Sequence, residues 1–227
     1  AMDPEIARVL SRFMLAMDNP DHMHFRNQVV SSFAPSQISS LKPLIEAGID
    51  DLIASLPVTE TVDFITDVAA FVPIKTICII MGIPEGDEQK VFEFTNAVFG
   101  TDDPDFATSL EDANQKYLEI FDYGWHILEA RRRDPRDDLL SKIAHAEIDG
   151  RPLSRDEKVS YFSNLIAAGN ETTRSSLAGA VWGLWRYPDQ RRMLTGDFSL
   201  MNNAIRELLR WYTPVFQMAR TAVHDTS

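Results

Sequence analysis

The sequence predicts a mainly α-helical protein with one long central helix and a minor strand near the carboxyl terminus. Apolar residues recur at spacings of three and four along most of the 227 residues, which is the helical period, and no run of alternating residues is convincing as a sheet. Turns rich in glycine and proline divide this pattern into segments of helix length. The segment after Ser154 then continues to Tyr187 without a proline.

The shorter helices are predicted from the turns that separate them. A Gly-Pro-Gly cluster ends the third, and three arginines in the last turn of the fifth complement the helix dipole. The expected helices cover residues 22–34, 36–56, 63–82, 87–100, 111–133 and 200–212, with a short one starting within 133–140, an Asp-Gly turn at 149–150 and a single strand at 215–223. In the second helix, Leu41, Leu44, Ile45, Ile49, Leu52 and Ile53 form one apolar stripe.

The long helix has a clear start. Ser154 and Glu157 are three residues apart, the spacing at which each side chain bonds the backbone of the other in a capping box. At about 1.5 Å per residue, the helix that follows is a rod of roughly 50 Å, long enough to cross a domain.

Composition excludes several classes of function. The net charge of −12 argues against nucleic acid or an anionic membrane as the main partner. The longest apolar stretch is interrupted by Pro73 and Lys75, so we expect no membrane span. Cys78 is the one cysteine, which excludes an internal disulfide and fits the reducing cytoplasm. Residues 1–5 are typical of a tag remnant, and residues 6–227 are expected to form a single domain.

A polar insert interrupts the apolar face of the long helix. Residues 165–179 read LIAAGNETTRSSLAG, and glycine, asparagine and threonine are poor helix formers. One interpretation is a local opening of the helix that presents an acid and an alcohol to a cavity. The other is an ordinary amphipathic helix on which Glu171 and Arg174 face solvent as an ion pair.

This insert resembles a motif of the cytochrome P-450 haem-thiolate monooxygenases. AAGNETT is similar to the oxygen-activation motif in the central helix of that family. Three further segments follow the family order: DNPDHMHFRNQVVSSFAP resembles the helix that binds the haem propionates, RELLR its Glu-x-x-Arg pair, and TPVFQMARTAV the strand beyond that pair. The segment RRRDPRDDLLSKIAHAEIDGRPLSRDE is typical of soluble bacterial members. The resemblance therefore implies a partial cytochrome P-450 fold.

The resemblance implies roles at the haem site. Glu171 and Thr172 would deliver protons to oxygen, because oxygen–oxygen cleavage needs protons without bulk water. Small residues beside them would leave room for haem and oxygen, and three cationic side chains would bind the haem propionates through charge-assisted hydrogen bonds. The small residues are Ala168 and Gly169, and the cationic residues are His22, Arg26 and Arg220. Taken without the resemblance, each of the three cationic residues is an ordinary surface charge.

Two further pairs receive roles from the resemblance. Val215 and Phe216 would contact substrate, with packing in the core as the alternative. Glu207 and Arg210 would form a buried structural pair with another arginine, whereas an exposed pair at this spacing contributes little to stability.

The resemblance implies an enzyme that uses haem b, O₂ and two electrons from a ferredoxin and its reductase. Its substrate would be an apolar small molecule such as a sterol, a terpenoid or an aliphatic chain. The axial cysteine of the family has no counterpart here, because Cys78 lies far upstream on an apolar helix. We therefore expect a truncated chain that lacks the amino-terminal β-region and the cysteine loop. The alternative is a truncated homologue without monooxygenase activity that binds a ligand or partner; an uncovered apolar patch would then favour self-association.

Overall fold

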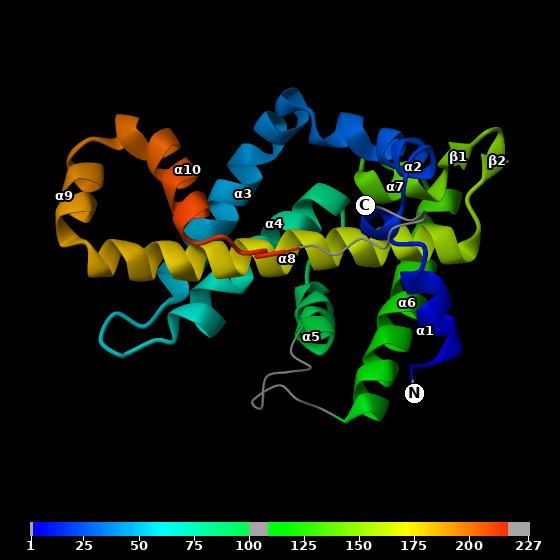
Figure 1. Ribbon diagram of the computed structural model, residues 1–227, viewed down its shortest axis with the longest axis horizontal. Coiled ribbons are helices and arrows are strands. Elements are labelled where there is room, and N and C mark those ends of the chain that lie inside the picture. Colours follow the sequence, from blue (N-terminus) through cyan, green and yellow to red (C-terminus); the bar gives the residue numbers. More distant parts are fainter. Residues whose placement is uncertain (1, 100–108, 218–227) are drawn as a thin grey trace, which may run out of the picture. The chain divides into compact units, whose positions relative to one another are not determined.

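The computed structural model describes residues 2–99 and 109–217, and helices dominate it as predicted (Figure 1). The chain divides into two compact units, residues 1–171 and 172–227. The first unit contains α1 (Pro4–Leu10), α2 (Asp21–Val29), α3 (Pro35–Ser55), α4 (Phe71–Met81), α5 (Glu88–Phe99), α6 (Leu110–Arg133), α7 (Leu139–Ala144), β1 (Glu147–Ile148) and β2 (Arg151–Pro152). The helix α8 (Arg155–Arg186) begins in the first unit and ends in the second, which also contains α9 (Pro188–Gly196) and α10 (Met201–Trp211).

The predicted capping box starts α8. The Ser154 backbone N–H donates to Glu157 Oε2 at 2.7 Å, and the Glu157 N–H donates to Ser154 Oγ at 3.3 Å. Arg151 adds a bidentate ion pair, with two N–H···O distances of 2.8 Å to the Glu157 carboxylate. Three donors therefore satisfy this carboxylate at the helix start, where a negative charge also interacts well with the helix dipole.

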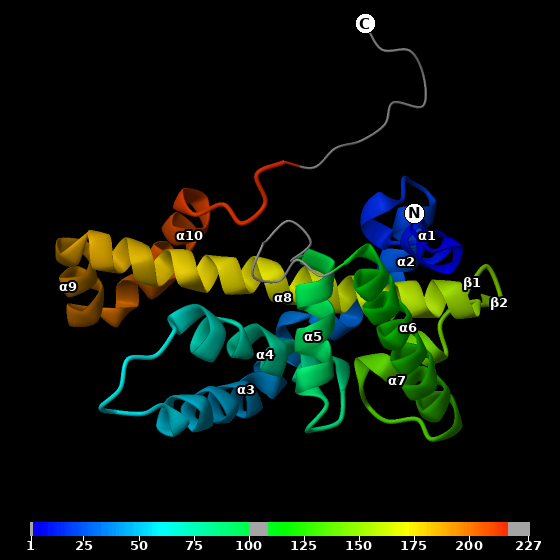
Figure 2. The same cartoon turned by 90° about the horizontal axis from the view of Figure 1, so that it is seen from below.

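The core of the first unit surrounds the amino-terminal half of α8. In Figures 1 and 2, α5 and α6 both cross this half of α8 at a steep angle. Phe162 and Ile166 of α8 are completely buried there. A Cβ atom on Gly124 of α6 would lie 2.5 Å from Cδ1 of the Phe162 ring. The absence of a side chain at Gly124 therefore lets α6 and α8 approach closely.

The predicted Asp-Gly turn joins β1 and β2. Asp149 and Gly150 have φ values of 54° and 75°, as a two-residue type I′ hairpin requires. The strands are antiparallel, and Ile148 pairs with Arg151.

Several expected boundaries differ from the structure. The helix predicted to reach residue 34 ends at Val29 and continues as the 3-10 helix Val30–Phe33. The predicted helix α3 forms despite Pro43, but none of its residues is fully buried, and Leu44 and Ile53 of the apolar stripe are exposed. This helix contacts the rest of the unit mainly through α4.

Two helices were not predicted, and the described part of the expected strand is not a strand. Pro4 and Glu5, set aside as part of a tag, form the first turn of α1, because the Asp3 carboxylate caps it by accepting from the Glu5 N–H at 2.7 Å. The helix α9 starts directly at Pro188, the residue expected only to end α8. Residues 215–217 form no strand, and the rest of that expected strand lies outside the described residues.

The second unit is held together by aromatic contacts between α8 and the end of α10. The Tyr212 ring lies over Gly179, where a Cβ atom would be 2.2 Å from Cδ1 of the ring. Trp182 packs edge-on against the same ring, with 6.0 Å between the centroids. A groove of about 520 Å³ between α8, α9 and α10 is lined mainly by apolar side chains, among them Leu184, Tyr187, Met193, Leu200, Ala204 and Trp211, together with Gln190, Asn203 and Glu207. Among the helices in the described part of the chain, none is both long enough and apolar enough to span a membrane.

We expect Gly124→Ala to lower the free energy of unfolding by about 1–3 kcal/mol, because the new methyl group overlaps the buried Phe162 ring. Urea unfolding followed by circular dichroism measures the change. Gly48→Ala is the control, since its Cβ would meet the flexible Lys75 side chain at 3.2 Å. Equal stability of the Gly124→Ala variant and the wild type would show that α6 and α8 do not need this close approach.

We expect Glu157→Gln to cost about 1 kcal/mol at pH 7, the usual value of a helix cap. Arg151 and the Ser154 N–H lower the pKa of the Glu157 carboxyl from 4.5 to about 2. Its contribution is therefore complete above pH 4.5 and is lost as the pH falls through about 2. The stability difference between wild type and variant, measured by unfolding at several pH values, should shrink over that range. Glu60→Gln, at an exposed loop position, should show no such trend.

Candidate functional site

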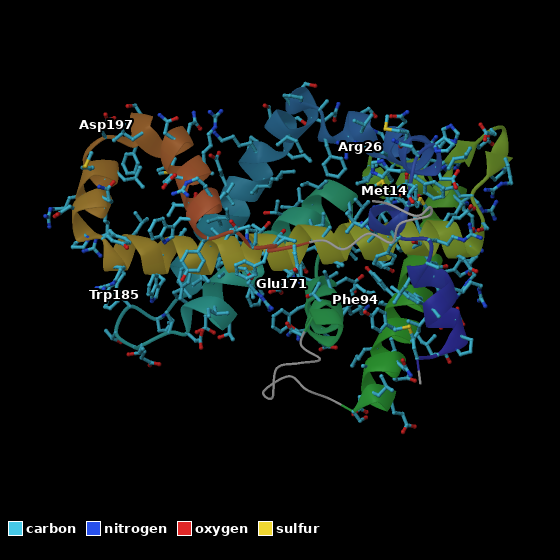
Figure 3. The ribbon with its side chains drawn as sticks, in the orientation of Figure 1. Met14, Arg26, Phe94, Glu171, Trp185 and Asp197 are labelled. Atoms are coloured by element: carbon cyan, nitrogen blue, oxygen red, sulfur yellow. The ribbon has the colours of Figure 1, made fainter. Side chains whose placement is uncertain are left out.

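The polar insert lies in the middle of α8, and the helix is unbroken through it. Each residue from Arg155 to Arg186 is α-helical, so the structure does not contain the local opening of the first interpretation. Glu171 is labelled there in Figure 3. Glu171 and Arg174 are both partly buried, so neither faces solvent fully as the other interpretation expected.

Asn170 explains why the insert stays helical. Its side chain is completely buried, and its Nδ2 group donates to Thr95 Oγ1 of α5 at 2.7 Å. An asparagine side chain destabilises a helix when it bonds to the nearby backbone instead. Because this amide bonds to another helix, it leaves the backbone hydrogen bonds of α8 intact. Neither Asn170 nor Thr95 was singled out from the sequence, since the two are 75 residues apart.

The hydrogen bond between Asn170 and Thr95, called the anchor below, also determines which residues of α8 face away from α5. Consecutive residues of an α-helix are rotated by roughly 100°, so Ala168 and Thr172 each lie about 200° from Asn170, together on the opposite face. Ala168 is exposed and Thr172 is partly buried. Gly169 faces α4, where a Cβ atom would lie 3.1 Å from Cδ1 of Ile77.

His22 and Arg26 lie one turn apart on α2, which contacts α8 through Phe25. Phe25 stacks on Tyr161 of α8 with ring centroids 5.3 Å apart, and the Tyr161 hydroxyl donates to the Phe25 carbonyl. Burial raises the pKa of this hydroxyl, so it remains a donor. Arg26, labelled in Figure 3, is exposed and His22 is partly buried. Neither side chain forms a hydrogen bond or ion pair with the residues that the structure describes.

The remaining predicted site residues belong to the second unit. Arg220 lies outside the described residues. Val215 and Phe216 are 45% and 93% exposed, so they do not pack in a core of the described residues. Glu207 and Arg210 form the predicted pair, with N–H···O distances of 2.8 and 2.7 Å, but it is exposed. Exposed pairs of this kind contribute little to stability.

Cys78 is a buried part of the core, as the sequence indicated. It lies on α4 with 2% of its surface exposed. Burial raises the pKa of its thiol to about 12, so the thiol stays protonated at neutral pH. The thiolate is the form that reacts and binds metals.

Comparison with known proteins finds a hydroxylase and a monooxygenase among the relatives of this chain. The chain is 35% identical over 226 residues to a methyl-branched lipid omega-hydroxylase of Mycobacterium tuberculosis, covering 98% of this chain and 53% of that protein. It is 30% identical to a linalool 8-monooxygenase of Pseudomonas putida, covering 93% of this chain and 52% of the relative. A solved cytochrome P-450 of Mycobacterium marinum, in complex with pseudoionone, matches the fold with a TM-score of 0.86 and 28% identity over 93% of this chain and 52% of that one. The chain thus spans about half the length of the relatives it matches. No family model matches it.

We expect Cys78 to resist modification by a thiol reagent at pH 8, because it is both buried and protonated. The measurement is the rate of labelling by a chromogenic disulfide reagent in buffer and in denaturing urea. Labelling should be fast only in urea, and Cys78→Ala gives the blank. Fast labelling of the folded protein would contradict the buried position of this thiol.

Proposed function

The chain belongs to the cytochrome P-450 family, and we propose that it forms the distal part of the haem pocket of a monooxygenase that hydroxylates an apolar small molecule. The observation that carries this proposal is the arrangement of α8. Asn170 is anchored on α5, so Ala168 and Thr172 share the opposite face of an unbroken helix. A small residue and an alcohol on one face, next to the acid Glu171, are what the resemblance requires.

The residues of α2 suit the binding of an anionic cofactor. His22 and Arg26 are donors on one helical face, and neither is engaged by the described residues. They would hold the propionates of haem b, with Arg220 as a third donor. Haem, when bound, supplies the iron at which O₂ is activated. Ala168 and Gly169 would leave the space beside it.

Glu171 and Thr172 would move protons at this face. The hydroxyl of Thr172 both donates and accepts a hydrogen bond, so it can pass on a proton that the Glu171 carboxyl supplies. Restricted access of bulk water at this face would protect the reaction from side products.

The relatives support a proposal for the class of substrate. A methyl-branched lipid, linalool and pseudoionone are named for the proteins that this chain resembles, and all are apolar. We infer an aliphatic, terpenoid or sterol substrate, with Val215 and Phe216 among its contacts. Electrons would come from a ferredoxin and its reductase in the cytoplasm.

A second candidate function is favoured by the exposed aromatic side chains of the second unit. Trp185 and Phe198 are 67% and 68% exposed, close in sequence to the apolar groove. Surfaces of this kind favour association with a partner. In this candidate the chain is a homologue without monooxygenase activity that binds a partner or another copy of itself.

The first test is the carbon monoxide difference spectrum of the reduced, purified protein. A Soret band of the thiolate type is expected from the natural polypeptide that contains residues 6–227. If that polypeptide binds no haem, the monooxygenase proposal fails and the partner-binding candidate gains support.

In the haem-loaded protein, we expect Thr172→Ala to uncouple oxygen consumption from product formation, with product per O₂ falling on the order of tenfold or more. Peroxide and product are measured together against O₂ uptake. Thr173→Ala, one position further along the helix, is the matched control and should keep the wild-type ratio. Equal coupling in the Thr172→Ala variant and the wild type would eliminate the proton-transfer role.

If the second candidate holds, we expect the purified 227-residue chain to self-associate at working concentration. Static light scattering gives its mass, and Trp185→Arg should shift it toward the monomer, because it places a charge on an exposed apolar surface. The exposed Glu60→Gln variant is the control. A monodisperse wild-type monomer would contradict self-association.

A further inference from the structure

We propose that Asn170 and Thr95 are positioning residues, whose hydrogen bond sets the rotation of α8 and thereby the directions of Glu171 and Thr172. The anchor is a property of the folded chain. Its consequence for oxygen chemistry rests on the function proposed above.

The hydrogen bond joins two helices deep in the first unit. Thr95 and Asn170 both have 0% of their surface exposed. The Thr95 hydroxyl lies 2.9 Å from the Phe92 carbonyl oxygen and 3.1 Å from that of Val91. Its single proton goes to one of these backbone oxygens, which leaves its oxygen to accept the Asn170 Nδ2 proton at 2.7 Å. The backbone of α5 therefore fixes the direction of the bond.

The helix α5 is itself held in place, so it can serve as a reference. Phe94 packs edge-on against Tyr117 of α6, with 5.8 Å between the ring centroids. Phe92 stacks on Phe71 of α4 at 6.5 Å. Figure 3 shows Phe94 on α5 and Glu171 on α8. The contacts of Phe92 with α4 and of Phe94 with α6 therefore restrain the position of Thr95 on α5.

The anchor discriminates between rotations of α8 because neighbouring residues have different chemistry. A rotation of roughly 100° would bring Gly169 or Glu171 to Thr95 in place of Asn170. Glycine has no group to donate, and a carboxylate cannot donate to the Thr95 oxygen when ionised. Neither of these two rotations therefore keeps the hydrogen bond to Thr95.

The amide of Asn170 also costs stability, which argues for a role in positioning. Its Oδ1 atom is buried and accepts no hydrogen bond from the described residues. An unsatisfied buried acceptor lowers stability, whereas an apolar side chain of similar shape avoids that cost. A single buried asparagine is known to fix the register of packed helices at the expense of stability. Asn170 has the same features between α5 and α8.

The anchor is tested first by hydrogen exchange on the 227-residue chain. Thr95→Val removes the hydroxyl, and Thr95→Ser keeps it. We expect exchange protection of the amides of residues 169–174 to fall on the order of tenfold in Thr95→Val, and to stay within about twofold of wild type in Thr95→Ser. Ser163→Ala is the matched control, because Ser163 Oγ donates at 2.8 Å to the Val159 carbonyl of the same helix and bonds to no second helix among the described residues. Unchanged protection in Thr95→Val would overturn the anchor. A loss of protection in Thr95→Ser or Ser163→Ala as large as that in Thr95→Val would overturn it too.

The consequence for chemistry is tested by Asn170→Leu in the haem-loaded protein. We expect a midpoint of unfolding equal to or above that of wild type, together with a loss of product per O₂ on the order of fivefold or more. A merely structural residue would change these two quantities together. Wild-type coupling in Asn170→Leu would show that the anchor does not position Glu171 and Thr172. If the wild type binds no haem, the proposed function fails, and the exchange experiment still decides whether the anchor exists.

Discussion

The amino-terminal half of α8 is largely enclosed by other helices, so several of its faces must each fit a different neighbour. Tyr161 stacks on Phe25 of α2, Phe162 packs on Gly124 of α6, and Asn170 bonds to Thr95 of α5. A helix with one solvent face needs only an apolar stripe to find its place. An enclosed helix needs specific contacts on several faces. These contacts fix its rotation about its own axis as well as its position in the core. The packing of the first unit depends on this requirement.

Enclosure also makes the polar groups of α8 expensive. Lys158 is buried and donates to the Ala144 carbonyl at 2.7 Å, and burial lowers the pKa of its amine. Ser160 Oγ and Asn164 Oδ1 are buried without a hydrogen-bond partner among the described residues. Each such atom costs free energy that an apolar side chain would not. Stability alone therefore does not account for this half of the helix.

Local chemistry explains which features were predictable from the sequence. The start of α8 and the β1–β2 turn depend on residues three positions apart or fewer, Ser154 with Glu157 and Asp149 with Gly150. The resemblance in AAGNETT led to the family. The partner of Asn170 lies 75 residues away, and no local pattern reveals it. For the same reason the weak helix propensity of the insert suggested an opening, which tertiary contacts prevent.

The continuity of α8 connects core packing to the acid and alcohol. Thr172 lies two residues after Asn170, a rise of only about 3 Å along the helix axis. The Ser176 hydroxyl donates to the Thr172 carbonyl at 2.7 Å, and the helix continues unbroken beyond it to Arg186. A rotation fixed at Asn170 is therefore transmitted to Thr172 almost without loss, which would not hold for residues on a flexible loop. The precision needed at a reacting group would then come from a buried contact on the opposite face of the same helix.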